Sequence, residues 1–271
     1  MINHAAIFPD EDYRFAMKFE REPPADFFAP TPAHSRVLAE RRKWLDTSAG
    51  DYVALDSEGT PLVIETLGLF RDWSQNRYSV PTSEDPSLTT WTDLGRAVEA
   101  DLLLLEASPD GAFRLRAGCV CFPSSWSLAE KMGHTVEEIH GIVPGLNAAL
   151  ARPISGFLSK MAPGIAWRRA NWGLSRSAEL NLHPHRKLPR LDDTIGHGDV
   201  WLRIEHQALV ALPRTRGILF GIRVEVLPLS EVLRDAAAAA GLHRALRTMP
   251  GAVAIYKGIA PALPRLLTLV G

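Results

Sequence analysis

Polar side chains recur at every second position of the stretch WLRIEHQALVALP, residues 201–213. Arg203, Glu205 and Gln207 are expected to share one face of a strand, because alternate residues of a strand point to the same side. A glutamate in such a row can pair with the neighbouring arginine and with a cationic substrate, whereas a solvent-facing charged strand is the simpler interpretation. His206 is expected on the opposite face among aliphatic side chains. A lone histidine there is more often a hydrogen-bonded core group than a ligand.

His140 is a second candidate, because it ends the stretch GHTVEEIH, residues 133–140. Thr135 and Glu138 form a capping-box pattern that predicts the start of a short helix. A neutral imidazole at the C-terminus of that helix can bind a metal through one nitrogen while the other donates to a free carbonyl. The same position suits a protonated imidazole that only caps the helix dipole. His134 is not on the same helical face as His140, so the spacing does not indicate zinc.

The composition argues against several classes of protein. Thirty basic residues and 31 acidic residues leave a net charge of −1, so we expect neither a nucleic acid nor an anionic membrane as a partner. Acidic residues near the N-terminus and a lysine and prolines within 251–271 are untypical of a signal peptide or a membrane helix, so we expect a cytoplasmic protein. Phosphate-loop, GxGxxG, HExxH and GxSxG motifs do not occur. Cys119 and Cys121 form no CxxC or CxxCH pattern, and we expect two buried strand cysteines.

The elements that would position these residues indicate an α+β fold. The strand at 201–213 and the stretch 218–229 are joined by the turn PRTRG and predict an antiparallel hairpin. Paired strands with separate helices favour α+β over a doubly wound parallel sheet. The run at 61–70 is compatible with either a strand or a helix. Further expected elements are a strand at 113–123, an amphipathic helix at 36–46, a loop at Gly50, a helix at 93–105 with Asp93 as N-cap, a short helix from the capping-box pattern Ser127–Glu130, and a long loop at 183–199.

Several stretches also carry a resemblance to a known family. They are VLAERRKWL, CVCFPSSWSLAEKMGHTVEEIHGIVPG, RRANWGL and WLRIEHQALVALPRTRGILFGIRV. Together, and in this order, they resemble the haem-binding subunit of the haem-dependent oxidative N-demethylases, also called dimethylamine monooxygenase, from about residue 36 to residue 230. The resemblance implies a PAS-like antiparallel sheet with flanking helices. It also implies that residues 1–271 form a single domain with N- and C-terminal helical extensions, which binds haem b non-covalently.

The reaction that the resemblance implies is oxidative removal of a methyl group from a small alkylamine. It uses dioxygen and electrons from a separate flavin and iron–sulfur reductase subunit. The histidine of the family's "IH…VP" stretch aligns with His140, which we therefore expect to be the axial haem ligand. The residues expected to be catalytic are Glu205, which would orient the substrate ammonium, Gln207 and His206. Those expected to bind the cofactor are His140, Arg169, Asn171, Trp172, Arg203 and Arg223, with Arg169 or Arg203 at the haem propionates.

Two positions depart from the family. It usually carries arginine and threonine where this chain has His206 and Ala208. Exchange of a guanidinium for an imidazole is not conservative. If the family's arginine helps to hold a propionate or the oxidant, this protein would act on a different amine or would have lost turnover. His206 is then a second candidate haem ligand. A non-catalytic haem-binding sensor or carrier with a PAS-like fold remains an alternative, as does a PAS-like domain that associates without haem.

Overall fold

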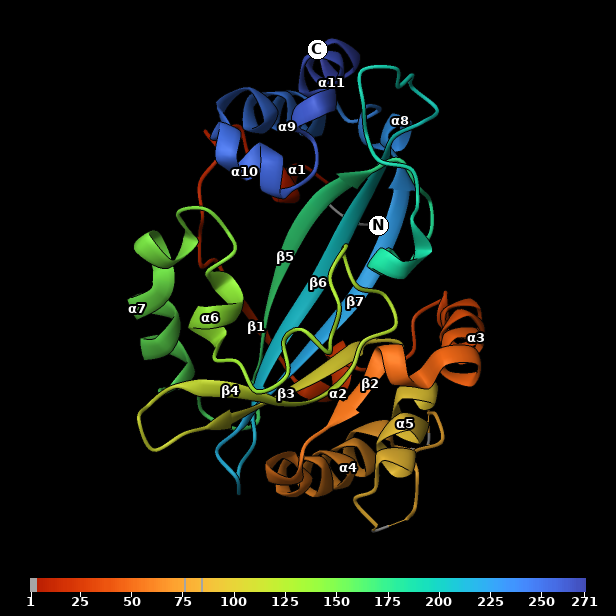
Figure 1. Cartoon of the computed structure of the whole chain (residues 1–271), viewed down its shortest axis with the longest axis vertical. Helices are drawn as coiled ribbons and strands as arrows, with labels where there is room; N and C mark the ends of the chain where they lie inside the picture. The colour runs from red at the N-terminus through yellow and green to blue at the C-terminus, as the bar shows by residue number, and fades with distance from the viewer. Residues whose placement is uncertain (1–3, 76, 84) are drawn as a thin grey trace.

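A seven-stranded sheet lies at the centre of the computed structural model, which describes residues 4–75, 77–83 and 85–271 (Figure 1). The strands lie in the order β1-β5-β6-β7-β3-β4-β2. Every neighbouring pair is antiparallel. The strands are β1 (Glu20–Glu22), β2 (Val53–Leu55), β3 (Asp101–Ala107), β4 (Phe113–Cys119), β5 (Ala166–Ser175), β6 (Trp201–Ala211) and β7 (Ile218–Pro228). The fold is therefore a mixture of helices and an antiparallel sheet, as predicted.

The long strands β5, β6 and β7 form the part of the sheet that matters most for function. β6 and β7 pair along their whole length, from Ala211 opposite Ile218 to Trp201 opposite Pro228. This register confirms the predicted hairpin. β5 pairs with β6 over ten consecutive positions, although its sequence was not predicted to form a strand. The predicted strand at 113–123 is also confirmed, but β4 ends at Cys119.

The helices gather in three groups around the sheet (Figure 1). The first and last helices lie at the upper end of the long strands, α6 and α7 lie along one side, and α3 to α5 lie near β2. The helices are α1 (His4–Ile7), α2 (Pro24–Phe27), α3 (His34–Tyr52), α4 (Thr60–Ser74), α5 (Leu88–Ala97), α6 (Val136–His140), α7 (Leu146–Leu158), α8 (Leu229–Val232), α9 (Ala236–Thr248), α10 (Gly251–Tyr256) and α11 (Leu263–Val270). Short 3₁₀ turns are η1 (Ser57–Gly59), η2 (Pro184–Arg186) and η3 (Ala260–Ala262).

Apolar side chains cover both faces of the sheet. On one face, Ile139 of α6 and Phe157 of α7 pack against a cluster that includes Ile222 of β7. On the other face, helices α2 to α5 pack against β3 and β4, and α9 to α11 pack against Leu202 and Ile204 of β6. Burial of these apolar surfaces is the main favourable contribution to folding. It also leaves a polar strip of β5 and β6 between the clusters.

The helix predicted at 93–105 is wrong in its position. α5 starts after Ser87, whose Oγ accepts a hydrogen bond from the backbone N of Thr90 at 3.3 Å. It ends at Ala97, and the run of leucines that follows belongs to β3. Because β3 is buried on both faces, its sequence is continuously apolar and lacks a strand's usual alternation.

The structure also settles several smaller expectations. The predicted helix at 36–46 is confirmed within α3, but the loop at Gly50 is wrong, because α3 continues to Tyr52 across a kink at Ser48. The ambiguous run at 61–70 is helical in α4. The helix expected from Ser127 is replaced by turns. Both cysteines are buried free thiols, although only Cys119 lies in the strand.

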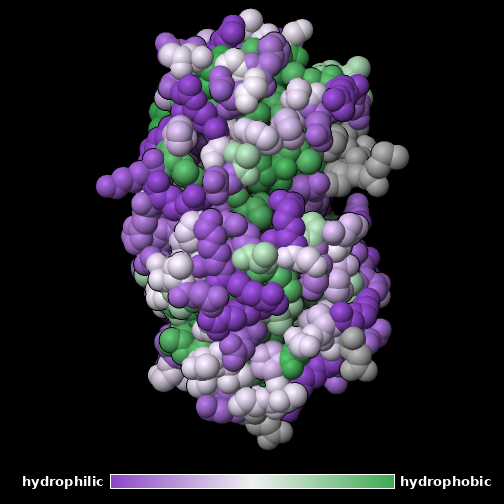
Figure 2. Space-filling view, turned by 90° about the vertical axis from the view of Figure 1, so that its right-hand side faces the viewer, coloured by the Kyte–Doolittle hydropathy of each residue, from purple (hydrophilic) through white to green (hydrophobic). Residues whose placement is uncertain are grey.

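Within the described residues, no helix combines the length and the apolar character needed to cross a bilayer. The side of the molecule on which α3 and η2 lie in Figure 1 is largely hydrophilic, with hydrophobic patches toward the end that holds the C-terminal helices (Figure 2).

Candidate functional site

The candidate site lies on one face of β5 and β6. Glu205 lies directly opposite Asn171, and Gln207 lies opposite Arg169. Directly opposed residues of an antiparallel pair project to the same side of the sheet. Arg203 is on this side too, because it is two residues from Glu205 along β6. The prediction that Arg203, Glu205 and Gln207 share a face is confirmed, and we call this side the site face.

The carboxylate of Glu205 is held by three side chains. Its Oε1 accepts a hydrogen bond from Ser124 Oγ at 2.5 Å, and its Oε2 accepts from Asn171 Nδ2 at 3.2 Å and from Gln207 Nε2 at 3.0 Å. Burial raises the pKa of Glu205, but the charge of Arg203 and the three hydrogen bonds outweigh it, so the pKa lies below its ordinary value. Glu205 is therefore an ionised carboxylate in a fixed orientation.

Arg203 supports Glu205 through hydrogen bonds to the groups around it. Its Nε donates to Ser124 Oγ at 2.7 Å, and its Nη1 donates to the carbonyl of Leu180 at 2.7 Å. Its Nη2 donates to the carbonyl of Phe122. Arg203 is 3% exposed, and each nitrogen of its guanidinium already has a protein partner. Arg203 thus positions Ser124, which in turn orients Glu205.

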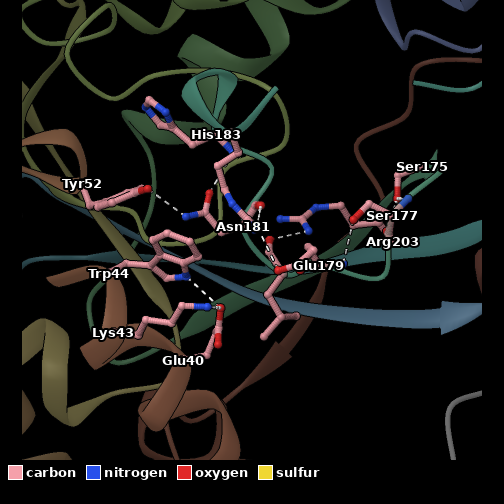
Figure 3. Close-up of polar contacts among 12 residues, drawn as sticks. Glu40, Lys43, Trp44, Tyr52, Ser175, Ser177, Glu179, Asn181, His183 and Arg203 are labelled. Carbon is pink, nitrogen blue, oxygen red and sulfur yellow. Dashed lines mark hydrogen bonds and ion pairs between the residues drawn. The ribbon is translucent and has the colours of Figure 1, made fainter. Parts of the chain in front are cut away.

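The segment that follows β5 is tied to α3, as Figure 3 shows. The side chain of Asn181 donates to the hydroxyl of Tyr52 at 2.9 Å and accepts from the backbone N of His183 at 2.8 Å. Arg186 donates to the carbonyl of Asn181 at 2.7 Å and lies 4.6 Å above the ring of Trp44. The first part of the predicted long loop is therefore anchored to α3. It follows closely on Leu180, whose carbonyl accepts a hydrogen bond from Arg203.

His140 lies at the end of α6, as predicted. The capping box that starts the helix is complete: Thr135 Oγ1 accepts from the backbone N of Glu138 at 3.1 Å, and Glu138 Oε2 accepts from the backbone N of Thr135 at 2.7 Å. Burial lowers the pKa of His140, and the nearby charge of Arg169 lowers it further. Neither ring nitrogen has a hydrogen-bond partner in the described part of the chain. The result is a neutral imidazole with a free nitrogen, the form that binds iron.

The charge of Arg169 is not neutralised by a direct ion pair within the described residues. Among the described residues its guanidinium forms no hydrogen bond and no ion pair. Burial lowers the pKa of Arg169, while the charge of Glu205 acts in the opposite direction. A partly buried charge without a hydrogen-bonded partner is costly, so this guanidinium is suited to receive an anionic group of a ligand.

Four residues beside the site were not singled out from the sequence. Lys257 Nζ donates to the carbonyl of Trp172 at 2.8 Å, and its charge interacts with Glu205. Tyr13 and Tyr256 lie near Arg169 and Glu205 respectively, and burial raises the pKa of both phenols, so both stay protonated. Ser124 is the fourth. A lysine that interrupts an apolar stretch was the one signal in the sequence that pointed to Lys257.

Three of the predicted residues lie on the other face of the sheet. Trp172 packs against Phe8 with the ring centroids 5.2 Å apart. His206 Nε2 lies 3.1 Å from Glu225 Oε2, and the guanidinium of Arg223 lies 4.5 Å above the ring of Phe27. The structure therefore brings His140, Arg169, Asn171, Arg203, Glu205 and Gln207 together on one side, and it separates Trp172, His206 and Arg223 from them.

Two cavities lie away from Glu205. One, of about 270 Å³, opens near the turns that end β6 and β3, and the other, of about 150 Å³, lies between α6 and α7. They share Phe113 and Leu158 as lining residues, and His140 lines the second. The larger cavity is lined mostly by apolar residues, whereas the polar and charged side chains gather on the site face.

A comparison with known protein families identifies the chain. Residues 73–267, which are more than half of the sequence, match the family described as haem-dependent oxidative N-demethylase, alpha subunit-like. The chain belongs to this family. The residues that match the demethylase family include His140, the site face and Lys257, but not Tyr13. The resemblance noted in the sequence is confirmed, and the family description names haem dependence, oxidative N-demethylation and an alpha subunit.

The residues on the site face fit a haem. Within the described residues, no group of three or more His, Cys, Asp or Glu is placed to hold a metal ion. A haem iron requires only axial ligation from the protein, which a single histidine can supply. The free imidazole of His140 matches that requirement, and the uncompensated guanidinium of Arg169 matches a propionate.

Proposed function

We propose that this protein is a haem b-dependent monooxygenase that removes a methyl group from a small alkylamine by oxidation. In this proposal residues 1–271 form one PAS-like haem-binding domain with N- and C-terminal helical extensions. The supporting observation is that a free neutral imidazole, an uncompensated guanidinium and an oriented carboxylate lie together around one face of the sheet. These groups belong to His140, Arg169 and Glu205 respectively.

Each residue of the site has a distinct role in binding. His140 would hold the iron through a ring nitrogen, and Arg169 would receive a propionate in a charge-assisted hydrogen bond. Arg203 acts through Ser124, because its own nitrogens donate to protein atoms. Asn171 and Gln207 fix Glu205 Oε2. Haem, when bound, supplies the iron at which dioxygen is activated.

Glu205 is the natural partner of the substrate nitrogen. A dialkylamine is a cation at neutral pH, and the lowered pKa of Glu205 keeps its carboxylate ionised there. An N–H of the ammonium would donate to a Glu205 oxygen, which would orient the methyl group. The two further catalytic assignments, Gln207 and His206, stay predictions, and so do cofactor roles for Trp172 and Arg223 on the other face.

The electrons would come from a separate flavin and iron–sulfur reductase subunit. The sequence has neither a nucleotide-binding motif nor a cluster of cysteines that would bind an iron–sulfur centre. The protein would therefore depend on an external donor for turnover, which agrees with the description of its family as alpha subunit-like.

The experiment that tests this proposal uses the full chain purified from haem-supplied cells. A Soret absorption band is expected, together with amine-dependent oxygen consumption once a reductase is added. The chain alone with NADPH and amine should be inactive, and turnover by the chain alone would contradict the need for a partner. Haem binding without amine-dependent oxygen consumption would favour a non-catalytic sensor or carrier, and absence of haem would overturn both.

A further inference from the structure

We infer that Lys257 and Arg169 form a carboxylate-binding subsite beside Glu205. The inference rests on the proposed function, since two ligands of that function can carry the carboxylate. One is haem, through its propionates. The other is the amine itself, if the substrate is an N-methylated amino acid and not a simple alkylamine. Both share the chemistry that this pair of cations recognises.

The position of Lys257 is set by the edge of the sheet. β1 pairs with β5 only from Ala166 to Arg168, so the outer edge of β5 beyond Arg168 has no neighbouring strand in the described structure. α10 lies beside this edge in Figure 1, and Lys257 follows it directly. Lys257 Nζ donates to the carbonyl of Trp172 at 2.8 Å and lies 5.2 Å from the ring of Trp172. The ammonium is thereby fixed at the edge of the sheet, where the charges of Glu205 and Arg169 act on it.

The ammonium of Lys257 has hydrogen-bonding capacity to spare. A lysine ammonium has three donors. The bond to the Trp172 carbonyl is the one hydrogen bond that Lys257 Nζ makes in the described chain, and it forms no ion pair there. A carbonyl satisfies a donor but does not neutralise the charge, so a counterion is still missing.

The charges around Glu205 are unbalanced. Arg203, Arg169 and Lys257 are three cations, and Glu205 is the one acidic group that interacts with all three. Glu205 is already engaged, because Ser124, which also receives Arg203, holds one of its oxygens and two amides hold the other. Arg169 and Lys257 are therefore left without an anion. An incoming carboxylate would form charge-assisted hydrogen bonds with both and remove the cost of burying them unpaired.

The acidity of Lys257 agrees with this assignment. Burial lowers its pKa to about 8, Glu205 opposes that shift and Arg169 adds to it. The phenols of Tyr13 and Tyr256, near Arg169 and Glu205, stay neutral. A bound carboxylate would raise the pKa of Lys257 again, so binding of the carboxylate and protonation of Lys257 favour each other.

The first experiment titrates the chain with haem and with haem dimethyl ester, whose propionates are blocked. Lys257→Met and Arg169→Met are compared with Lys160→Met, a matched control at an exposed position without a side-chain partner. If propionates occupy the subsite, each variant should bind haem about 10- to 100-fold more weakly than wild type. Its affinity for the ester should match that of wild type for the ester. Lys257→Arg should restore haem affinity, because it keeps a cation.

The second experiment measures the binding of N,N-dimethylglycine and of dimethylamine by isothermal titration calorimetry. If the substrate supplies the carboxylate, Lys257→Met should weaken binding of N,N-dimethylglycine about 10-fold or more and leave dimethylamine unchanged. This arm does not require haem, so it tests the subsite even if the proposed function fails. Unchanged affinities for both haem and N,N-dimethylglycine in folded Lys257→Met, checked by circular dichroism, would overturn the inference.

The pH dependence of carboxylate affinity distinguishes a binding role of Lys257 from a purely structural one. A purely structural lysine would not change this dependence. Lys257 is charged below pH 8 and becomes neutral as the pH rises through its pKa of about 8. The affinity for the carboxylate ligand should therefore fall above pH 8 in wild type. In Lys257→Arg the affinity should stay level to about pH 10, because a guanidinium remains charged there. An identical fall in both proteins would contradict a carboxylate bound to Lys257.

Discussion

Two arginine clusters in this molecule differ in how completely their charges are satisfied. Arg41 of α3 is fully buried, and its Nε donates to the carbonyl of Gly95 at 2.7 Å. Its Nη1 forms an ion pair with Asp101 at 2.6 Å, and its Nη2 lies 3.5 Å from Cys119 Sγ. Arg169 of β5 has no such partners in the described structure.

The carboxylate of Asp101 completes the first cluster. It also accepts hydrogen bonds from the backbone N atoms of Cys121 at 2.7 Å and of Phe122 at 3.0 Å. The Arg41 cluster therefore joins α3, β3 and the segment after β4, and its function is to hold the fold. By contrast, the charged side chains of Arg169 and Lys257 have no ion-pair partner among the described residues. We therefore expect removal of one partner to destabilise the Arg41 cluster, whereas loss of Arg169 or Lys257 should affect ligand binding.

The largest effect is expected where the Arg41 cluster is broken. Arg41→Met should lower the free energy of unfolding by about 3–5 kcal/mol, because it leaves the Asp101 carboxylate buried without its counterion. Urea unfolding monitored by circular dichroism measures this loss. The matched control is Arg169→Met in the ligand-free protein, where removal of an unpaired cation should change stability by less than about 1 kcal/mol. Equal losses in the two variants would erase the distinction between the clusters.

Removal of the proposed iron ligand should affect binding and leave the fold in place. His140→Ala should lose haem or change its spectrum, because neither ring nitrogen of His140 supports the protein structure. Far-ultraviolet circular dichroism should remain native. His134→Ala, at an exposed position just before α6, serves as the control and should keep its haem. Unchanged haem content and spectrum in His140→Ala would reassign the ligand, with His206 as the next candidate.

A smaller effect is expected at Glu205, where a structural role and a substrate role can be separated. Glu205→Gln should keep haem and fold but weaken amine binding about 10- to 100-fold, since a charge-assisted hydrogen bond contributes roughly 1.5–3 kcal/mol. The amine-induced spectral shift reports this affinity. Glu225→Gln on the opposite face is the control. A loss of thermal stability in Glu205→Gln with unchanged amine affinity would make Glu205 a partner of Arg203 alone.

Local sequence patterns predicted the parts of the site that a single element determines. The alternation in β6 predicted that Arg203, Glu205 and Gln207 share a face, because side-chain direction in a strand depends only on its period of two. The capping box predicted the start of the helix that His140 ends, because its hydrogen bonds join residues three positions apart. The family was also recognisable from its motifs, and residues 73–267 confirm it.

Contacts between distant parts of the chain were beyond such patterns. Ser124 binds a carboxylate 81 residues away in the sequence, and Lys257 binds a carbonyl 85 residues away. Periodicity also misassigned the leucine run of β3, because burial on both faces of the sheet removes the alternation that identifies a strand. The types of residue available for chemistry were therefore determined by the sequence. Only the tertiary structure decided which charged side chains have a hydrogen-bonded or ion-pair partner and which have none, because that depends on strand pairing and on packing between elements far apart in the chain.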